Sequence, residues 1–193
     1  MDLLLALLLA IVLALCLSLL LFQAVTGVPP LSATRAEAAN VVALLREAGL
    51  PAQAVVYDLG SGWGSLIVAL AQAFPQMRIV GIEWSPLPCW IARLRTRGMP
   101  NVRVLRGDFY DCDVREAQAV TCYLMRKPMP RLARFLDSAL ADDTPVVALA
   151  FWFHERVPSA VRQGRLGGAA LYRWPAREMY KAEVSVKSEQ VDE

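Results

Sequence analysis

The sequence has few of the residues that bind metals or form disulfide frameworks. Its 193 residues include one histidine, His154, and four cysteines, with no CxxC pair and no histidine at ligand spacing from a cysteine. Structural zinc sites and disulfide frameworks both need clusters of these residues. We therefore expect no metal site and cysteines that stay reduced.

The chain also lacks a large excess of charge of one sign. Its 20 Lys and Arg residues and 18 Asp and Glu residues give a formal net charge of +2, without a basic stripe of the kind that neutralises phosphates. We therefore expect no nucleic-acid partner. The cationic residues Arg93, Arg95, Arg97, Arg126 and Lys127 form either a solvated basic face or a contact with anionic lipid headgroups.

Residues 3–22 form a long run with no charge and a single hydroxyl, Ser18. Twenty residues in a helix span about 30 Å, the thickness of a bilayer's hydrocarbon core. A cleaved signal peptide would start with a positive charge and have a shorter apolar run, whereas Asp2 stands at the start here. The run predicts a transmembrane anchor over residues 1–24. Because Arg35 is the only cation that follows closely, the positive-inside rule places the rest of the chain in the cytoplasm of a single-pass protein.

Residues 25–50 follow as a hinge, GVPPLS, and a helix. Thr34 and Glu37 have the spacing of a capping box, which predicts a helix from there to about Ala48, and Gly49 ends it.

Residues 51–186 alternate between short apolar strands and helical segments. The strands are AVVYDL, RIVGIE, NVRVLRG, AVTCYLM and PVVALAF, and the helices are GSLIVALAQAF, LPCWIARLRTR and PRLARFLDSAL. This order predicts an α/β domain with a parallel sheet covered on both faces. At the end, AALYRW and MYKAEVSV predict an antiparallel hairpin, and residues 187–193 a polar tail.

A glycine loop, DLGSGWGS, follows the first predicted strand. No lysine is near, which excludes a P-loop, and the glycine spacing G-x-G-x-G places the third glycine one position too early for a dinucleotide fingerprint. Bare backbone at Gly60 and Gly62 would let a ligand lie against the turn, with helix N–H groups facing a carboxylate. Trp63 either covers the ligand at the loop or packs outward against the capped helix.

Three acidic residues end three successive strands. Asp58 precedes the glycines, Glu83 ends the second strand 25 positions later, and Asp108 follows the third strand. The carboxyl ends of parallel strands meet at one edge of a sheet, where ligands bind. Glu83 stands about where an acidic residue meets ribose hydroxyls.

These features resemble the class I S-adenosylmethionine (SAM)-dependent methyltransferases over about residues 50–186. More narrowly, the hydrophobic start, the VPP hinge, the capped helix, DLGSGWGS, GIEWSPLPCWIARLR and RGDFYD resemble the small membrane-anchored lysine methyltransferases whose mitochondrial members modify the ATP synthase c-subunit and the adenine nucleotide translocase. The resemblance implies a Rossmann-like α/β fold and SAM as cofactor. The sequence departs from the family at Trp63, where an acidic residue is common, and at Ser65, which is often basic.

The resemblance implies specific cofactor contacts. They are Asp58, Gly60, Gly62, Glu83 and Asp108, to which we add the neighbouring Ser61, Gly64, Trp84 and Phe109 as candidate contacts. Asp58 would meet the ammonium group of SAM, Glu83 the ribose and Asp108 the adenine amino group. Trp84 either covers the adenine or plays no part in the site.

Methyl transfer from a sulfonium needs proximity and a dry site more than a dedicated base. Tyr123, near the end of the fourth predicted strand, is the candidate catalytic residue as part of a channel for the acceptor, with an ordinary half-buried strand aromatic as the alternative. His154 is either a base or a loop or core residue. The Asn/Asp-Pro-Pro-Tyr/Phe motif of glutamine and adenine methyltransferases is missing, which disfavours those acceptors.

We therefore expect a membrane-anchored methyltransferase that acts on lysine in a membrane-associated protein. Anchoring raises the local concentration of an acceptor in the same membrane. Two alternatives stay open: a lipid or small amphiphile as acceptor, and a non-catalytic scaffold that keeps the fold.

Overall fold

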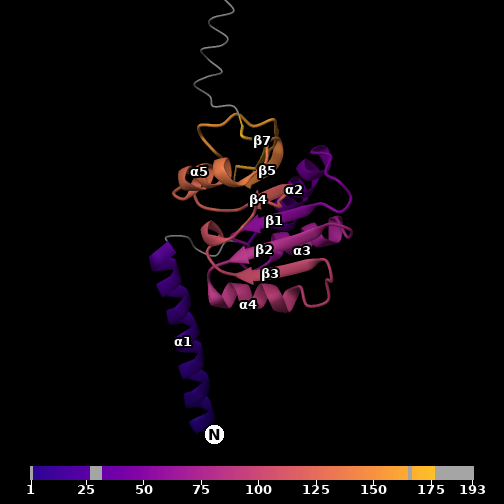
Figure 1. The fold of residues 1–193 in the computed structure, drawn as a ribbon. Helices are drawn as coiled ribbons and strands as arrows, with labels where there is room; N and C mark the ends of the chain where they lie inside the picture. Colours follow the sequence, from indigo (N-terminus) through magenta and orange to yellow (C-terminus); the bar gives the residue numbers. More distant parts are fainter. Residues whose placement is uncertain (1, 27–31, 165–166, 177–193) are drawn as a thin grey trace, which may run out of the picture.

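The structure, a computed structural model, describes residues 2–26, 32–164 and 167–176. Its centre is a seven-stranded sheet with the order β3-β2-β1-β4-β5-β7-β6 (Figure 1). The strands are β1 (Val55–Leu59), β2 (Arg78–Glu83), β3 (Val102–Arg106), β4 (Ala119–Cys122), β5 (Thr144–Leu149), β6 (Ala160–Arg162) and β7 (Ala169–Trp174). The first five strands run parallel, whereas β7 is antiparallel to both of its neighbours. The predicted Rossmann-like sheet, mostly parallel with an antiparallel C-terminal part, is therefore confirmed.

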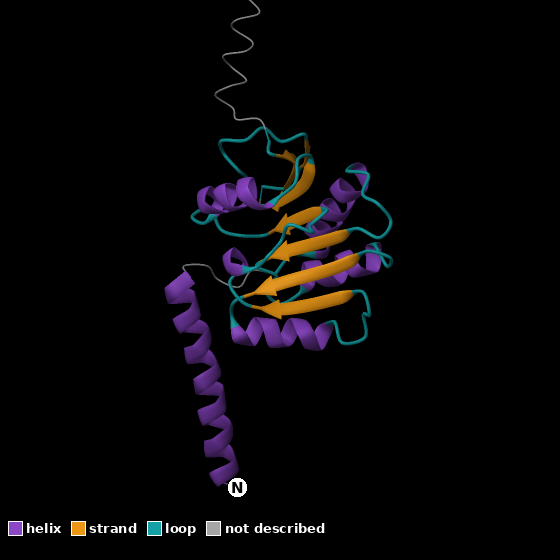
Figure 2. Cartoon of the chain, viewed as in Figure 1, coloured by secondary structure: helices purple, strands orange, loops and turns teal. Residues whose placement is uncertain are grey.

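Helices cover both faces of this sheet. The elements are α2 (Arg35–Glu47), α3 (Ser65–Ala73) and α4 (Pro86–Arg95) on one face, and α5 (Met129–Ala139) with the short 3₁₀ helix η1 (Phe109–Asp111) on the other. Successive side chains of a strand point to opposite faces. In β1, Val56 accordingly packs in the core under α2 and α3, and Tyr57 packs in the core under α5. The arrowheads of β1, β2 and β3 all lie at one edge of the sheet, where the glycine loop begins (Figure 2).

The fourth strand is shorter than the sequence predicts. The predicted segment AVTCYLM contains β4 only as far as Cys122, so Tyr123 lies beyond the strand. The physical reason is the pairing with β1, whose last residue in register, Leu59, pairs with Cys122 before β1 turns away at Gly60. Tyr123 therefore follows the last paired residue of β4 and lies at the end of the sheet where the carboxyl ends of the parallel strands meet.

The C-terminal hairpin also differs from the prediction in its partner strand. AALYRW forms β7 as predicted, but β7 pairs with β6, a strand of three residues that is too short to give a sequence pattern. The segment MYKAEVSV and the polar tail 187–193 lie outside the described residues.

The predicted capping box is present at the start of α2. The Glu37 N–H donates to Thr34 Oγ1 at 3.3 Å, and Glu37 Oε2 accepts from the Thr34 N–H at 2.8 Å. The helix ends at Glu47, and Gly49 follows with a φ of +70°. Of the GVPPLS hinge, the structure describes Ser32 alone.

An N-terminal helix, α1 (Asp2–Thr26), stands beside the sheet domain and outside its layers (Figure 1). It exposes large apolar side chains, among them Leu3, Leu4, Leu9 and Leu13. Within the described ranges, however, no helix combines the length and the hydropathy that crossing a membrane requires. The structure therefore does not support the predicted transmembrane helix.

Candidate functional site

The glycine loop connects β1 to α3 and depends on backbone conformations that glycine adopts most easily. Gly60 has a φ of +75°, and a Cβ there would lie 2.6 Å from Leu124 Cδ2. Gly64 has a φ of +79° at the start of α3, and its Cβ would lie 3.0 Å from the Cβ of Ala92 in α4. Left-handed backbone costs a residue with a side chain roughly 1–2 kcal/mol. Packing against α4 therefore requires glycine at position 64, in addition to any ligand. At position 60 the neighbour is the end of a flexible Leu124 side chain, and the left-handed φ is the main requirement.

Glu83, at the end of β2, fastens this loop to the sheet. Its Oε2 accepts from the Gly62 N–H at 2.8 Å, and its Oε1 accepts from the Ser85 N–H at 2.7 Å. The side chain is buried between the loop and the start of α4. Each carboxylate oxygen has a second lone pair, so Glu83 can hold the loop and still accept a hydrogen bond from a ligand.

Asp58 is a buried carboxylate directly before the loop. Thr121, its partner in the register of β1 and β4, donates from Oγ1 to Asp58 Oδ1 at 2.8 Å. Burial raises the pKa of Asp58 from 3.8 to about 7; the Thr121 hydrogen bond lowers this pKa and the charge of Glu83 raises it. The thiol pKa of the neighbouring Cys122 is also raised, first by burial and then by Asp58. At neutral pH, Asp58 is therefore able to gain or lose its charge when a ligand binds.

Replacing Thr121 with valine is expected to raise the pKa of Asp58 further. Valine keeps the shape of the side chain but removes the hydrogen bond that favours the charged carboxylate. A hydrogen bond to a charged group contributes roughly 1.5–3 kcal/mol, so we expect a rise of about one pH unit or more. NMR titration of the side-chain carboxyl carbon would measure it. Thr121→Ser, which keeps the hydroxyl, should restore the native value, and equal titration of the Val variant and the native chain would contradict the expectation.

The other acidic candidate, Asp108, lies next to Glu83 at the same edge. The Gly107 N–H donates to the backbone carbonyl of Glu83 at 3.1 Å, and Asp108 caps η1 by accepting from the Tyr110 N–H at 3.0 Å. Phe109 stacks against Tyr110 with ring centroids 4.3 Å apart. The structure thus brings the ends of β1, β2 and β3 together, and Trp84, after Glu83, is 45% exposed there.

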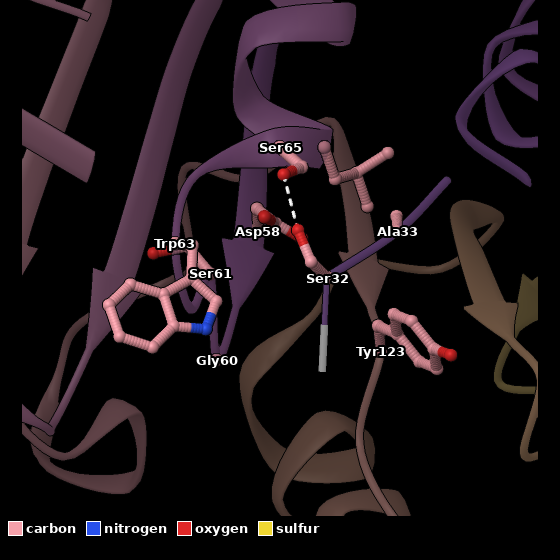
Figure 3. Close-up of a pocket in the computed structure, with 9 residues that line it drawn as sticks. Ser32, Ala33, Asp58, Gly60, Ser61, Trp63, Ser65 and Tyr123 are labelled. Atoms are coloured by element: carbon pink, nitrogen blue, oxygen red, sulfur yellow. Dashed lines mark hydrogen bonds between the residues drawn. The ribbon is translucent and has the colours of Figure 1, made fainter. Parts of the chain in front are cut away.

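A small pocket lies beside the loop (Figure 3). Its lining consists of Ser32, Ala33, Asp58, Gly60, Ser61, Trp63, Ser65, Leu66 and Tyr123. Trp63 and Tyr123 lie on opposite sides of Asp58 (Figure 3). Ser32 and Ala33 were not expected from the sequence, because no local pattern places a residue before α2 against the start of α3. The hydroxyls of Ser32 and Ser65 share a hydrogen bond at 2.6 Å.

The residues of this pocket fit the amino acid end of SAM. Asp58 offers a carboxylate to an ammonium group, and the buried hydroxyl of Ser61 has no hydrogen-bond partner within the described part of the chain. An unpartnered buried polar atom is costly and calls for a partner from outside the chain. The enclosed space is only about 10 Å³, room for one water molecule, so the pocket as it stands is smaller than SAM.

Tyr123 lies at the pocket, whereas His154 does not. Tyr123 lines the pocket, and its pKa is raised by burial and then by the charge of Glu37, the capping-box carboxylate of α2. His154 is exposed and is not among the residues that line the pocket. Of the two, the structure therefore brings Tyr123 to the site.

Comparison with known proteins identifies the family. The model of the family described as the ANTKMT methyltransferase domain matches residues 58–160. A protein-lysine N-methyltransferase of Saccharolobus islandicus is 30% identical over 100 residues, which are 50% of this chain and 62% of that protein. A release factor glutamine methyltransferase of Mycolicibacterium smegmatis is 36% identical over 102 residues, 52% of this chain and 36% of that protein. The chain thus spans less than two thirds of the length of these curated relatives.

A solved structure of a methyltransferase supports this family assignment. The RNA methyltransferase of Salinibacter ruber in complex with S-adenosyl-L-homocysteine is similar with a TM-score of 0.63 and 30% identity, over 75% of this chain and 92% of that one. The family and the similar fold agree on SAM as the cofactor. The chain belongs to the ANTKMT methyltransferase domain family and carries a SAM-dependent methyltransferase domain.

Proposed function

We propose that this chain transfers a methyl group from SAM to the side-chain amine of a lysine in a membrane-associated protein. The observation that carries the proposal is the pocket between the glycine loop and Tyr123, which joins a buried carboxylate to an aromatic residue at the carboxyl edge of the sheet. The similarity to a protein-lysine N-methyltransferase supports lysine as the acceptor.

The residues of the site divide between the parts of SAM. Asp58 and Ser61 would hold the ammonium and carboxylate end, close to the backbone of Gly60, Gly62 and Gly64. Glu83 would accept from the ribose hydroxyls and Asp108 from the adenine amino group, with Phe109 and Trp84 as the residues beside the ring. The bound cofactor supplies an electrophilic methyl group on a sulfonium.

The chain's task in the transfer step is to orient a neutral amine and to exclude water. An unprotonated amine is already nucleophilic, so no base has to act on it within the site, and proximity supplies much of the rate. Tyr123 is well placed for this role, because its ring borders the pocket and its hydroxyl can accept from or donate to an approaching amine.

Replacing Tyr123 with phenylalanine is expected to lower kcat about fivefold with little change in the Kd for SAM. The ring that borders the pocket stays, while one hydrogen bond of roughly 1 kcal/mol to the acceptor is lost. Single-turnover kinetics and calorimetry would measure the two quantities. Tyr57→Phe, which removes a hydroxyl bonded to Glu116 instead, is the matched control. An unchanged kcat in Tyr123→Phe would show that the residue is an ordinary half-buried aromatic.

The membrane part of the proposal depends on α1. Its exposed leucines are costly in water, and a continuous apolar surface of this kind calls for an apolar partner. We propose that α1 associates with a lipid bilayer and so holds the domain near its acceptor. Flotation of the full chain with phosphatidylcholine vesicles tests this association, and a chain that stays at the bottom of the gradient would contradict it.

Transfer itself is tested by incubating the chain with isolated membranes and SAM labelled on its methyl group, and then separating protein, lipid and RNA. We expect label in protein, with mass spectrometry placing it on lysine. Label in lipid would establish the amphiphile alternative, and label in RNA would assign the acceptor of the Salinibacter ruber neighbour instead. No label and no binding of SAM would leave the scaffold alternative.

A further inference from the structure

The outward face of α4 combines apolar and cationic side chains in one stripe. Trp90, Arg93 and Leu94 recur at the i, i+3 and i+4 spacing that places residues on one side of a helix, and Arg97 follows in the turn after α4 ends at Arg95. Trp90 is 61% exposed and Leu94 is 55% exposed, whereas Ala92 of the same helix is fully buried. We refer to these four residues as the α4 surface.

The α4 surface belongs to a segment of the chain whose charged residues are all positive. Between Trp84 and Gly107 the sequence has no acidic residue and five arginines, all exposed: Arg93, Arg95, Arg97, Arg103 and Arg106. In the part of the chain that the structure describes, none of the five forms an ion pair. Arg93 and Arg95 donate instead to the backbone carbonyls of Val104 and Trp63, which fixes their positions and leaves their charges uncompensated.

This combination fits the surface of an anionic bilayer. An indole and a leucine insert into the boundary between headgroups and acyl chains, while arginines meet the lipid phosphates. RNA would also attract the arginines and could stack on Trp90. RNA binding would not, however, bury the aliphatic side chain of Leu94, which lies beside Trp90 on the stripe. We propose that the α4 surface docks on anionic lipid headgroups and so sets how the methyltransferase domain faces the membrane. This inference rests on the proposed membrane association of the chain and adds a second, charge-dependent contact to it.

The test uses the full chain bound to vesicles whose brominated acyl chains quench nearby tryptophan. We expect fluorescence to be quenched more in vesicles that contain phosphatidylserine than in pure phosphatidylcholine. Trp90→Phe should lose this additional quenching while the chain still floats with the vesicles. Arg97→Glu should lower the docking equilibrium about tenfold. Arg134→Glu is the matched control, because it makes the same charge change on α5, which packs on the opposite face of the sheet, and it should behave as the native chain does.

The outcomes distinguish this inference from the proposed function. A chain that floats with vesicles but shows the same quenching in Trp90→Phe as in the native chain overturns the docking surface alone. A chain that does not float overturns the membrane association itself. Fluorescence changes at Trp90 on adding RNA, without lipid, would assign the surface to RNA. Self-association that Trp90→Phe abolishes, again without lipid, would assign it to a second copy of the chain. Either result would overturn the lipid proposal.

Discussion

Replacing Asp58 with asparagine is expected to weaken SAM binding about a hundredfold and, at pH 8, to make the domain without cofactor more stable. The loss of affinity follows from the loss of a buried charge that would pair with the ammonium group of SAM. Hydrogen bonds to charged groups contribute roughly 1.5–3 kcal/mol, and the upper part of this range corresponds to about a hundredfold.

The gain in stability follows from the pKa of Asp58. Because burial raises this pKa to about 7 in the folded chain from an ordinary value of 3.8, folding favours the protonated form. The corresponding stability is fully present below about pH 4 and is lost as the pH rises through 7. At pH 8 the native chain therefore carries the whole cost of a buried charge, a few kcal/mol, and asparagine avoids it. At pH 4 the two chains should be nearly equal.

Urea unfolding at pH 4 and pH 8, with calorimetric titration of SAM, would measure both effects. Asp142→Asn is the control, because Asp142 is an exposed carboxylate that does not line the pocket, and neither quantity should change in it. If Asp58→Asn lost stability at pH 8, interactions other than the Thr121 hydrogen bond would have to stabilise the buried charge of Asp58. An unchanged affinity for SAM would show that Asp58 does not contact the cofactor.

Replacing Gly64 with alanine is expected to lower the free energy of unfolding by about 3 kcal/mol. The left-handed backbone at φ +79° contributes roughly 1–2 kcal/mol of this cost. The rest comes from overpacking, roughly 1–3 kcal/mol, because the new Cβ would lie 3.0 Å from the Cβ and 3.1 Å from the Cα of Ala92. Since Ala92 Cα belongs to the backbone of α4, the strain cannot be relieved by turning a side chain.

Two other glycines separate these causes. Gly49 has a φ of +70°, but a Cβ at this position would have nothing within 4 Å. Gly49→Ala should therefore lower the free energy of unfolding only by the cost of the left-handed backbone. Gly98 has neither a left-handed φ nor a close neighbour, so Gly98→Ala should be close to neutral. Urea unfolding of the three variants measures the series. A loss in Gly64→Ala no larger than that in Gly49→Ala would show that α3 and α4 separate easily, and the close approach of the helices would then not explain the glycine.

Much of the fold was predictable because its signals are local. The Thr34 and Glu37 capping box starts α2 as expected, and the alternation of apolar and helical segments gives the parallel sheet. The strand β6 was missed because three residues carry no periodicity, and β4 was predicted too long because its end depends on where β1 turns away.

The site was predictable in part. The spacing of Asp58, Gly60 and Gly62 indicates a ligand loop, but the hydrogen bonds from Gly62 and Ser85 to Glu83 appear only when β2 lies beside the loop. The charge of Glu83 also raises the pKa of Asp58, an effect that a sequence pattern of separate strand-end acids does not show.

Periodicity and turn chemistry within a few residues are enough to predict the order of the elements, the glycine loop and the acidic residues at the strand ends. The tertiary structure determines which residues lie beside them. Thr121 reaches Asp58 across 63 positions, and Ser32 reaches Ser65 across 33. It also decided that Trp90 and Leu94 face outward. Such contacts depend on strand register and on which helix face the core covers, and both are set by the packing of segments that are distant in the chain.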